Sequence, residues 1–241
     1  GRVRFVDVAN ERVAGSWLCR AGSKDAKDAS QKSSADGIVS VCFPGASTGV
    51  TSSARALVCA GARSGAVSFL DRRGGRLVAG FRAHDDAVVA TAARGNDDEV
   101  SGHCLVTASR DKTVAVWDVR MLTDGAFATR AKDFTHTKKT PLLASFGGFG
   151  DGVRGMALRG ADAFVVAGEK VSVFSLDDRP VEKQQSDSRR QRDKMSVPVA
   201  PLRLRAQSGA KVRARLTGVV ALPRSRLFAV TDEDGKIRVC R

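Results

Sequence analysis

Four side chains in the middle of the chain combine residue types that do chemistry together in many proteins. They are His84, Thr107, Asp111 and Trp117, and Ser109 is a second candidate for the hydroxyl member. An imidazole oriented by a carboxylate can take a proton from a hydroxyl group, so a His–Asp–Thr catalytic set is one hypothesis. The other is structural, because a buried carboxylate needs a donor such as imidazole N–H and a buried indole N–H needs an acceptor. The structural hypothesis is favoured, since the sequence holds no Gly-x-Ser-x-Gly elbow and no His-Glu-x-x-His motif.

Two other groups could suggest a ligand or a metal. Glycine dominates Gly147-Gly148-Phe149-Gly150-Asp151-Gly152, but no Lys-Ser/Thr pair and no helical pattern follows, so we interpret this segment as a turn. The cysteines form no Cys-x-x-Cys pair and their number is odd, which predicts reduced, buried thiols in a cytoplasmic protein rather than a zinc site. We therefore expect no metal, no cofactor and no enzymatic activity. The five cysteines are Cys19, Cys42, Cys59, Cys104 and Cys240.

Positive charge is concentrated near the end of the chain. The whole sequence has a formal net charge of +14, and residues 179–241 hold 16 Lys and Arg against 6 Asp and Glu, a net of +10. Such a block attracts anionic lipid or nucleic acid. Nucleic-acid modules interleave aromatic residues with basic ones, whereas this block has one aromatic residue, Phe228, so lipid is favoured over RNA or DNA. The candidate basic residues are Arg189, Arg190, Arg192, Lys194, Arg203, Arg205, Lys211, Arg213 and Arg215.

The elements that position these side chains are predicted to be short β-strands. Apolar runs are brief and are bounded by Gly, Ser, Asp and Asn, as expected for strands joined by tight turns. One phrase, residues 105–118, reads as a strand, an Asp-led turn and a second strand that ends in Trp117-Asp118. Looser copies of this phrase lie at residues 57–71, 164–176 and 227–240, and residues 1–7 match its second half. A repeated strand pair of this kind predicts a repeat architecture.

These phrases resemble WD-repeat β-propellers, and the resemblance covers nearly the whole chain. It implies that His84, Thr107, Asp111 and Trp117 form a buried hydrogen-bonded set that stabilises one blade. The second strands of the phrases are 47 to 66 residues apart, whereas the family repeats every 40–45 residues or so. Polar insertions at 21–36, 94–102, 121–140 and 178–197 account for the excess.

The expected fold is therefore all-β, with about five four-stranded blades of which the first and last are incomplete. The chain lacks an initiator Met and opens in mid-strand. We expect it to be a partial propeller over 1–241, part of a seven-bladed ring whose missing blades lie upstream in the same protein. The predicted blade segments are roughly 1–20, 37–82, 83–146, 152–206 and 212–241.

A second resemblance is narrower. The order in which these sequence segments follow one another is similar to that in the C-terminal propeller of large BEACH-domain WD-repeat proteins of the endosomal type. This resemblance implies a non-catalytic scaffold in endosomal membrane trafficking or autophagy, cytoplasmic and peripheral on endosomal membranes, with other proteins bound through the propeller rim and loops. The similar stretches are residues 3–7, 69–71, 80–84, 116–117, 165–168 and 216–223.

Two alternative functions stay open at this point. Trp117-Asp118-Val119-Arg120 matches the Trp-Asp-x-Arg pattern of substrate receptors for cullin-type ubiquitin ligases, in which Asp118 and Arg120 would contact the adaptor. The net charge alternatively suggests an RNA-associated propeller in ribosome or RNA processing.

Overall fold

The computed structural model describes most of the predicted strands. All four predicted insertions fall wholly or almost wholly outside the described residues. The structure describes residues 2–18, 37–43, 57–73, 76–93, 104–119, 142–176, 200–201, 203–207, 214–222 and 225–241.

Every regular element in these ranges is a β-strand, which confirms the all-β prediction. The strands are rich in Val, Phe, Leu and Ala, residues that pack on a pleated surface. In chain order they are β1 (Arg2–Asp7), β2 (Arg12–Leu18), β3 (Ile38–Cys42), β4 (Leu57–Ala62), β5 (Ala66–Asp71), β6 (Arg76–Arg82), β7 (Val88–Ala93), β8 (Cys104–Ser109), β9 (Thr113–Asp118), β10 (Leu142–Gly147), β11 (Val153–Arg159), β12 (Asp162–Ala167), β13 (Lys170–Ser175), β14 (Ala200–Pro201), β15 (Arg203–Gln207), β16 (Leu216–Ala221), β17 (Phe228–Asp232) and β18 (Ile237–Cys240).

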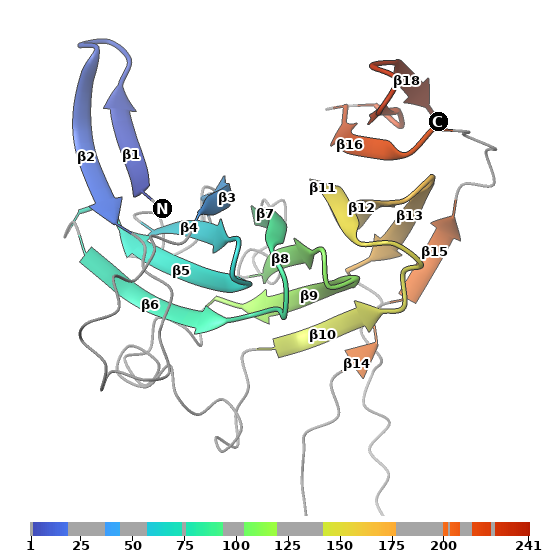
Figure 1. The fold of residues 1–241 in the computed structure, drawn as a ribbon, viewed down its shortest axis with the longest axis horizontal. Coiled ribbons are helices and arrows are strands. Elements are labelled where there is room, and N and C mark those ends of the chain that lie inside the picture. The colour runs from blue at the N-terminus through green and yellow to red at the C-terminus, as the bar shows by residue number, and fades with distance from the viewer. Residues whose placement is uncertain are drawn as a thin grey trace, which may run out of the picture.

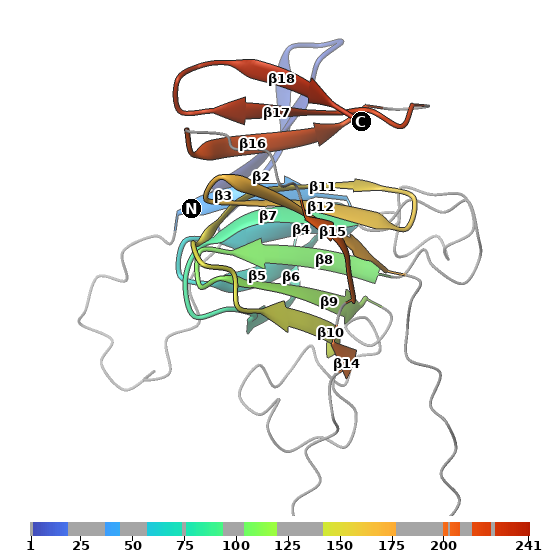
Figure 2. The same cartoon turned by 90° about the vertical axis from the view of Figure 1, so that its right-hand side faces the viewer.

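The strands form five sheets that follow one another along an arc (Figure 1). We call them blade 1 (β1–β2), blade 2 (β3–β6), blade 3 (β7–β10), blade 4 (β11–β13 and β15) and blade 5 (β16–β18). Successive strands within each blade pair antiparallel, and the short β14 adds to β10 in parallel. The first strands β3, β7, β11 and β16 lie side by side from blade to blade. Figure 2 shows blade 5 stacked on the β11–β12 side of blade 4.

Blades 2 to 5 share an irregularity at one position. The first strand of each begins with a single paired residue and is then interrupted by a bulge before pairing resumes. This first pair is a common reference position, so residues of different blades can be matched by counting from it, whatever their side chains. The first pairs are Ile38 with Ala62, Val88 with Ser109, Val153 with Ala167, and Leu216 with Asp232.

The core is divided among the spaces between blades, because each sheet buries a face against its neighbour. Phe81, Leu105 and Trp117 belong to a cluster shared by blades 2 and 3. Val116 and Phe174 belong to a cluster shared by blades 3 and 4, and a third cluster joins blades 4 and 5. No helix of the described residues is long and apolar enough to cross a membrane.

Candidate functional site

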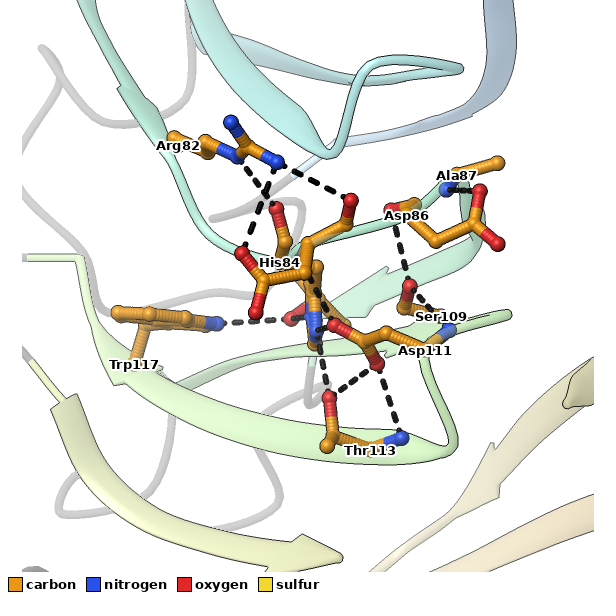
Figure 3. A network of polar contacts seen from close by, with 10 residues as sticks. Arg82, His84, Asp86, Ala87, Ser109, Asp111, Thr113 and Trp117 are labelled. Carbon is orange, nitrogen blue, oxygen red and sulfur yellow. Dashed lines mark hydrogen bonds and ion pairs between the residues drawn. The ribbon is translucent and has the colours of Figure 1, made fainter.

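The four predicted side chains meet at one end of blade 3 (Figure 3). His84 lies in the connection between β6 and β7, Thr107 on β8, Asp111 in the β8–β9 turn and Trp117 on β9. The Thr107 hydroxyl is shared, because it lies 2.7 Å from His84 Nε2 and accepts the Trp117 Nε1–H at 2.8 Å. His84 Nδ1 lies 3.2 Å from Asp111 Oδ2. The set therefore ties together two strands, a turn and the connection from the previous blade.

The hydrogen bonds of this set run in one direction. Since Thr107 Oγ1 accepts from the indole, its own proton is free to go to His84 Nε2. His84 then carries its hydrogen on Nδ1 and donates it to Thr113 Oγ1 at 2.8 Å, with Asp111 Oδ2 as the longer second acceptor. The Thr113 hydroxyl in turn donates to Asp111 Oδ1. Thr113 is thus a fifth member, which the sequence reasoning missed.

Asp111 closes the set because backbone donors also converge on its carboxylate. Oδ2 accepts the Asp85 amide at 2.8 Å and Oδ1 accepts the Thr113 amide at 3.0 Å. Burial alone raises the pKa of Asp111, but the Thr113 hydroxyl, these amides and His84 outweigh it and hold the pKa below its usual value. Asp111 is therefore an ionised acceptor that fixes the β8–β9 turn against the connection carrying Asp85.

Ser109 has a separate role in the same turn. Its hydroxyl donates to the Asp86 carbonyl at 2.9 Å and accepts the Asp111 amide at 3.1 Å (Figure 3). The structure therefore places Thr107, and not Ser109, between the histidine and the indole.

Burial gives this set a structural role. The His84 side chain is 1% exposed and that of Asp111 is 13% exposed. Burial lowers the pKa of His84 below its usual value, against the opposing pull of Asp111. The imidazole is therefore neutral at pH 7, as the one-directional chain of hydrogen bonds requires. A buried imidazole whose two nitrogens both have partners leaves no room for a substrate.

Blade 4 has aromatic and aliphatic side chains at the matching positions. Counting four residues before the first paired residue places Phe149 where blade 3 has His84. The same register matches Val165 to Thr107 and Phe174 to Trp117. The Phe149 and Phe174 rings lie 5.8 Å apart in an edge contact, and Phe146 lies 4.6 Å from Phe174. One blade is thus closed by hydrogen bonds and the next by edge-on and tilted contacts between aromatic rings.

The turn that carries Asp111 in blade 3 is one residue shorter in blade 4. Five residues, 109–113, separate the paired Ala108 and Val114, whereas four residues, 167–170, separate Val166 and Val171. Counted from β12, Glu169 stands where blade 3 has Asp111, but its side chain is exposed and makes no hydrogen bond with another described residue. A pocket of about 520 Å³ lies beside the shortened turn. Its lining residues are Phe146, Gly148, Phe149, Gly150, Asp151, Ala167, Glu169, Lys170, Ser172 and Arg215.

The charged side chains around this pocket lack partners within the described chain. Asp151, Glu169, Lys170 and Arg215 are all exposed. None of the four side chains forms a hydrogen bond or an ion pair with another described residue. Phe149, at 8% exposure, forms part of the floor. The pocket therefore combines aromatic side chains with two acidic and two basic groups that have no partner among the described residues.

The remaining predicted site residues are only partly described. Asp118 is 7% exposed and already has an interaction within the chain, so the structure gives no support to its use as an adaptor contact. Arg215 lies at the pocket, and Arg203 and Arg205 lie on β15, though their side chains are not described. Arg120, Arg189, Arg190, Arg192, Lys194, Lys211 and Arg213 lie outside the described residues.

The chain is similar in sequence to one distant curated relative. No model of a known protein family matches the chain. The chain is 27% identical over 244 residues to Protein GFS12 of Arabidopsis thaliana. That similarity covers 100% of this chain and 12% of GFS12, so the chain spans about an eighth of the length of this relative.

Solved structures of similar fold are WD40 propellers and designed proteins. The WD40 repeats of RRP9 have a TM-score of 0.57 at 14% identity, covering 85% of this chain and 48% of RRP9. The β-propeller domain of Cps50 (Swd1) from Myceliophteria thermophila has a TM-score of 0.55 at 12% identity, covering 85% of this chain and 54% of that one. The computationally designed Ika4 protein has a TM-score of 0.53 at 15% identity and is covered to 93%. With its antiparallel blades in an arc, the chain has the fold of a WD40 β-propeller.

Proposed function

We propose that this propeller is a non-catalytic protein-interaction scaffold whose partner docks on the blade 4 pocket. The observation that carries the proposal is a pocket lined by Phe146, Phe149 and four charged side chains that have no partner among the described residues. These four are Asp151, Glu169, Lys170 and Arg215. Concave sites with an apolar floor and a few convergent polar groups are where proteins bind ligands. Since both signs of charge are present, the partner we propose is a protein segment with an apolar anchor flanked by acidic and basic residues.

The setting of this scaffold is proposed to be endosomal membrane trafficking or autophagy, within a large BEACH-type protein. The resemblance of the order of these segments to that class supports this proposal. In this proposal the protein is cytoplasmic and peripheral on endosomal membranes. The net charge of +10 over residues 179–241 would add attraction to anionic lipid, at roughly 1 kcal/mol for each basic residue near the surface.

The test of partner binding fills the pocket without straining the fold. A Cβ at Gly150 meets nothing within 4 Å, so Gly150→Trp in the full-length protein places an indole in the pocket. Val8→Trp is the matched control, because Val8 is 84% exposed in the β1–β2 turn of another blade. With proximity labelling in cells, we expect a set of proteins whose recovery falls about tenfold with Gly150→Trp and is unchanged with Val8→Trp.

The identity of that set tests the setting. Partners drawn from endosomal or autophagic proteins support the trafficking role, whereas RNA-processing proteins or cullin adaptors contradict it. If Gly150→Trp and Val8→Trp leave the same proteins bound in the same amounts, the pocket is not the docking site and the proposal fails.

Lipid attraction has its own measurement. Liposome flotation of the full chain is expected to recover protein with vesicles that contain phosphatidylinositol phosphates and to lose it as salt is raised. Equal recovery with neutral vesicles, or no recovery at low salt, would remove lipid from the proposal.

A further inference from the structure

Two cysteines face each other across neighbouring strands of blade 2. Cys42 on β3 and Cys59 on β4 are direct partners in the antiparallel register, and both are free thiols. Cys59 belongs to the core cluster between blades 2 and 3, and Cys42 packs against that cluster. Opposite residues in an antiparallel pair have Cα atoms about 4.5–5.5 Å apart, which lies within the range of about 4.4–6.8 Å that a disulfide spans. The strand register is therefore compatible with a disulfide between Cys42 and Cys59.

The two thiols differ in their surroundings. Cys59 is 0% exposed within the core between blades 2 and 3, whereas Cys42 is half-buried at the last position of β3. The neighbouring Cys59 lowers the pKa of Cys42 below its usual value, against the opposing effect of burial. Burial raises the pKa of Cys59, and its contact with Cys42 adds to this effect.

We propose that Cys42 and Cys59 form an oxidant-sensitive modification site at which a hydroperoxide converts the facing thiols into a disulfide. A partly accessible thiol beside a second cysteine is the arrangement that sensor thiols use. The site is independent of the blade 4 pocket and of the proposed partner binding, because it lies in another blade.

The chemistry balances with hydrogen peroxide as the oxidant. The Cys42 thiolate attacks one peroxide oxygen, the O–O bond breaks, and Cys42 sulfenic acid and hydroxide result. The Cys59 sulfur then attacks the Cys42 sulfur, the S–O bond breaks, and the departing hydroxide takes the Cys59 proton to leave as water. Overall, the two thiols lose two electrons and two hydrogens, and the peroxide is reduced to two waters.

Cys240 supplies a matched control within the same chain. It is also half-buried at the last position of a strand, β18, and it is also a free thiol. Its register partner is Phe228 rather than a cysteine, so it has no facing thiol to complete a disulfide. Exposure and position are therefore comparable, and the facing thiol is what differs.

The experiment treats the folded full chain with stepwise hydrogen peroxide and maps the cysteine peptides by mass spectrometry. We expect the wild type to lose about 2 Da through a Cys42–Cys59 cross-link that dithiothreitol reverses. This should occur before Cys240 is oxidised. In Cys59→Ser, the cross-link is absent and Cys42 is instead trapped as a sulfenic acid by dimedone. Cys240→Ser should cross-link like the wild type.

Two results would overturn the proposal. One is that Cys42 and Cys59 stay reduced at peroxide concentrations that oxidise Cys240. The other is that wild-type Cys42 accumulates a dimedone adduct to the same level as in Cys59→Ser, which would mean that Cys59 does not resolve it. Because Cys240→Ser leaves the facing pair intact, loss of the cross-link in that variant would also contradict the assignment.

Discussion

Blades 3 and 4 fill equivalent positions with opposite chemistry. In blade 3, Thr107 bridges the buried groups of His84 and Trp117. In blade 4, Phe149, Val165 and Phe174 occupy the same register positions and contact one another through their side chains or through the surrounding core. Each blade nonetheless forms the same antiparallel strands with the same bulge. The fold therefore requires that this space be filled and that its polar atoms be paired, but it does not require a particular chemistry.

The difference also separates stability from binding. In blade 3, Asp111 draws the β8–β9 turn onto the incoming connection, since its carboxylate accepts the Asp85 amide. In blade 4 the carboxylate of the shorter turn, Glu169, is exposed and accepts no such hydrogen bond from another described residue, and it lines the pocket instead. The apolar side chains of blade 4 need no hydrogen-bond partner such as the Asp111 carboxylate, so the end of the blade is left open for another molecule. A buried polar set has no such freedom, because each missing partner costs free energy.

The largest effect is expected from removing the shared hydroxyl of blade 3. Thr107→Val keeps the volume but leaves the Trp117 N–H and the His84 Nε2 without partners at a position that is 0% exposed. Each buried unpaired group costs about 1–3 kcal/mol, so we expect a loss of about 3 kcal/mol in the free energy of unfolding. Urea denaturation followed by tryptophan fluorescence measures it.

The reciprocal change in blade 4 is the control for that measurement. Val165→Thr introduces a hydroxyl beside aromatic rings at a position that is also 0% exposed. It should cost about 1–3 kcal/mol, because that hydroxyl is buried among apolar side chains. If both substitutions cost less than about 0.5 kcal/mol, pairing of polar atoms is not what distinguishes the two blades.

A smaller net effect is expected when the whole aromatic set is moved into blade 3. The triple variant His84→Phe/Thr107→Val/Trp117→Phe copies the blade 4 residues. It removes the buried polar groups together, so none is stranded except Asp111, which is partly exposed and keeps its amide donors. We expect a cost of about 1–2 kcal/mol, below that of Thr107→Val alone. A cost equal to or above the sum of the three single variants would contradict the interchangeability of the two sets.

The sequence was sufficient to predict blade 3 but not the pocket of blade 4. A Trp-Asp strand end, an Asp-led turn and an upstream histidine are distinctive residue types, and the structure brings His84, Thr107, Asp111 and Trp117 together. Thr113 was missed because a threonine after a turn reads as an ordinary strand residue. The available signal was its place two residues after Asp111, where an aspartate commonly accepts the amide.

The pocket left no residue type to recognise. It arises from a missing turn residue and from Phe149 standing at the position of His84, and only the strand register makes that correspondence visible. The glycines of 147–152 were interpreted as a turn between blades, and the structure places Gly147 at the end of β10 and the other three in the β10–β11 connection. The facing of Cys42 and Cys59 likewise depends on register, since most of the residues between them lie outside the described ones.

The polar set should also make stability depend on pH, in a way that the aromatic set does not. The folded pKa of His84 lies below its unfolded value, so the unfolded chain binds more protons near pH 6. Stability is therefore complete above the unfolded pKa of about 6.5 and falls as pH is lowered through it. Asp111, whose pKa is also lowered in the folded state, adds a further loss below about pH 4.

Urea denaturation at pH 8, 7, 6 and 5.5 measures the histidine contribution. The free energy of unfolding should fall by at most about 1.4 kcal/mol for each pH unit. The triple variant lacks the imidazole and should show a flatter profile between pH 7 and 5.5. Parallel profiles for wild type and variant would show that His84 does not contribute.

The smallest effect concerns the backbone of the turn that presents Asp111. Lys112 has a φ of 69°. The strand register shows that Gly65 of blade 2 and Gly235 of blade 5 occupy the equivalent turn position, and their φ values are 85° and 75°. A side chain in this left-handed region costs about 1 kcal/mol that glycine avoids, although glycine loses more entropy on folding. Lys112→Gly should therefore raise the free energy of unfolding by about 0.5 kcal/mol, measured by thermal and urea denaturation. Lys112→Ala keeps the Cβ and removes the charge, so it should give no such gain. A higher free energy of unfolding in both variants would assign the effect to the lysine charge. A lower free energy of unfolding in Lys112→Gly would mean that the Asp111 carboxylate already holds this turn too firmly for the backbone strain to matter.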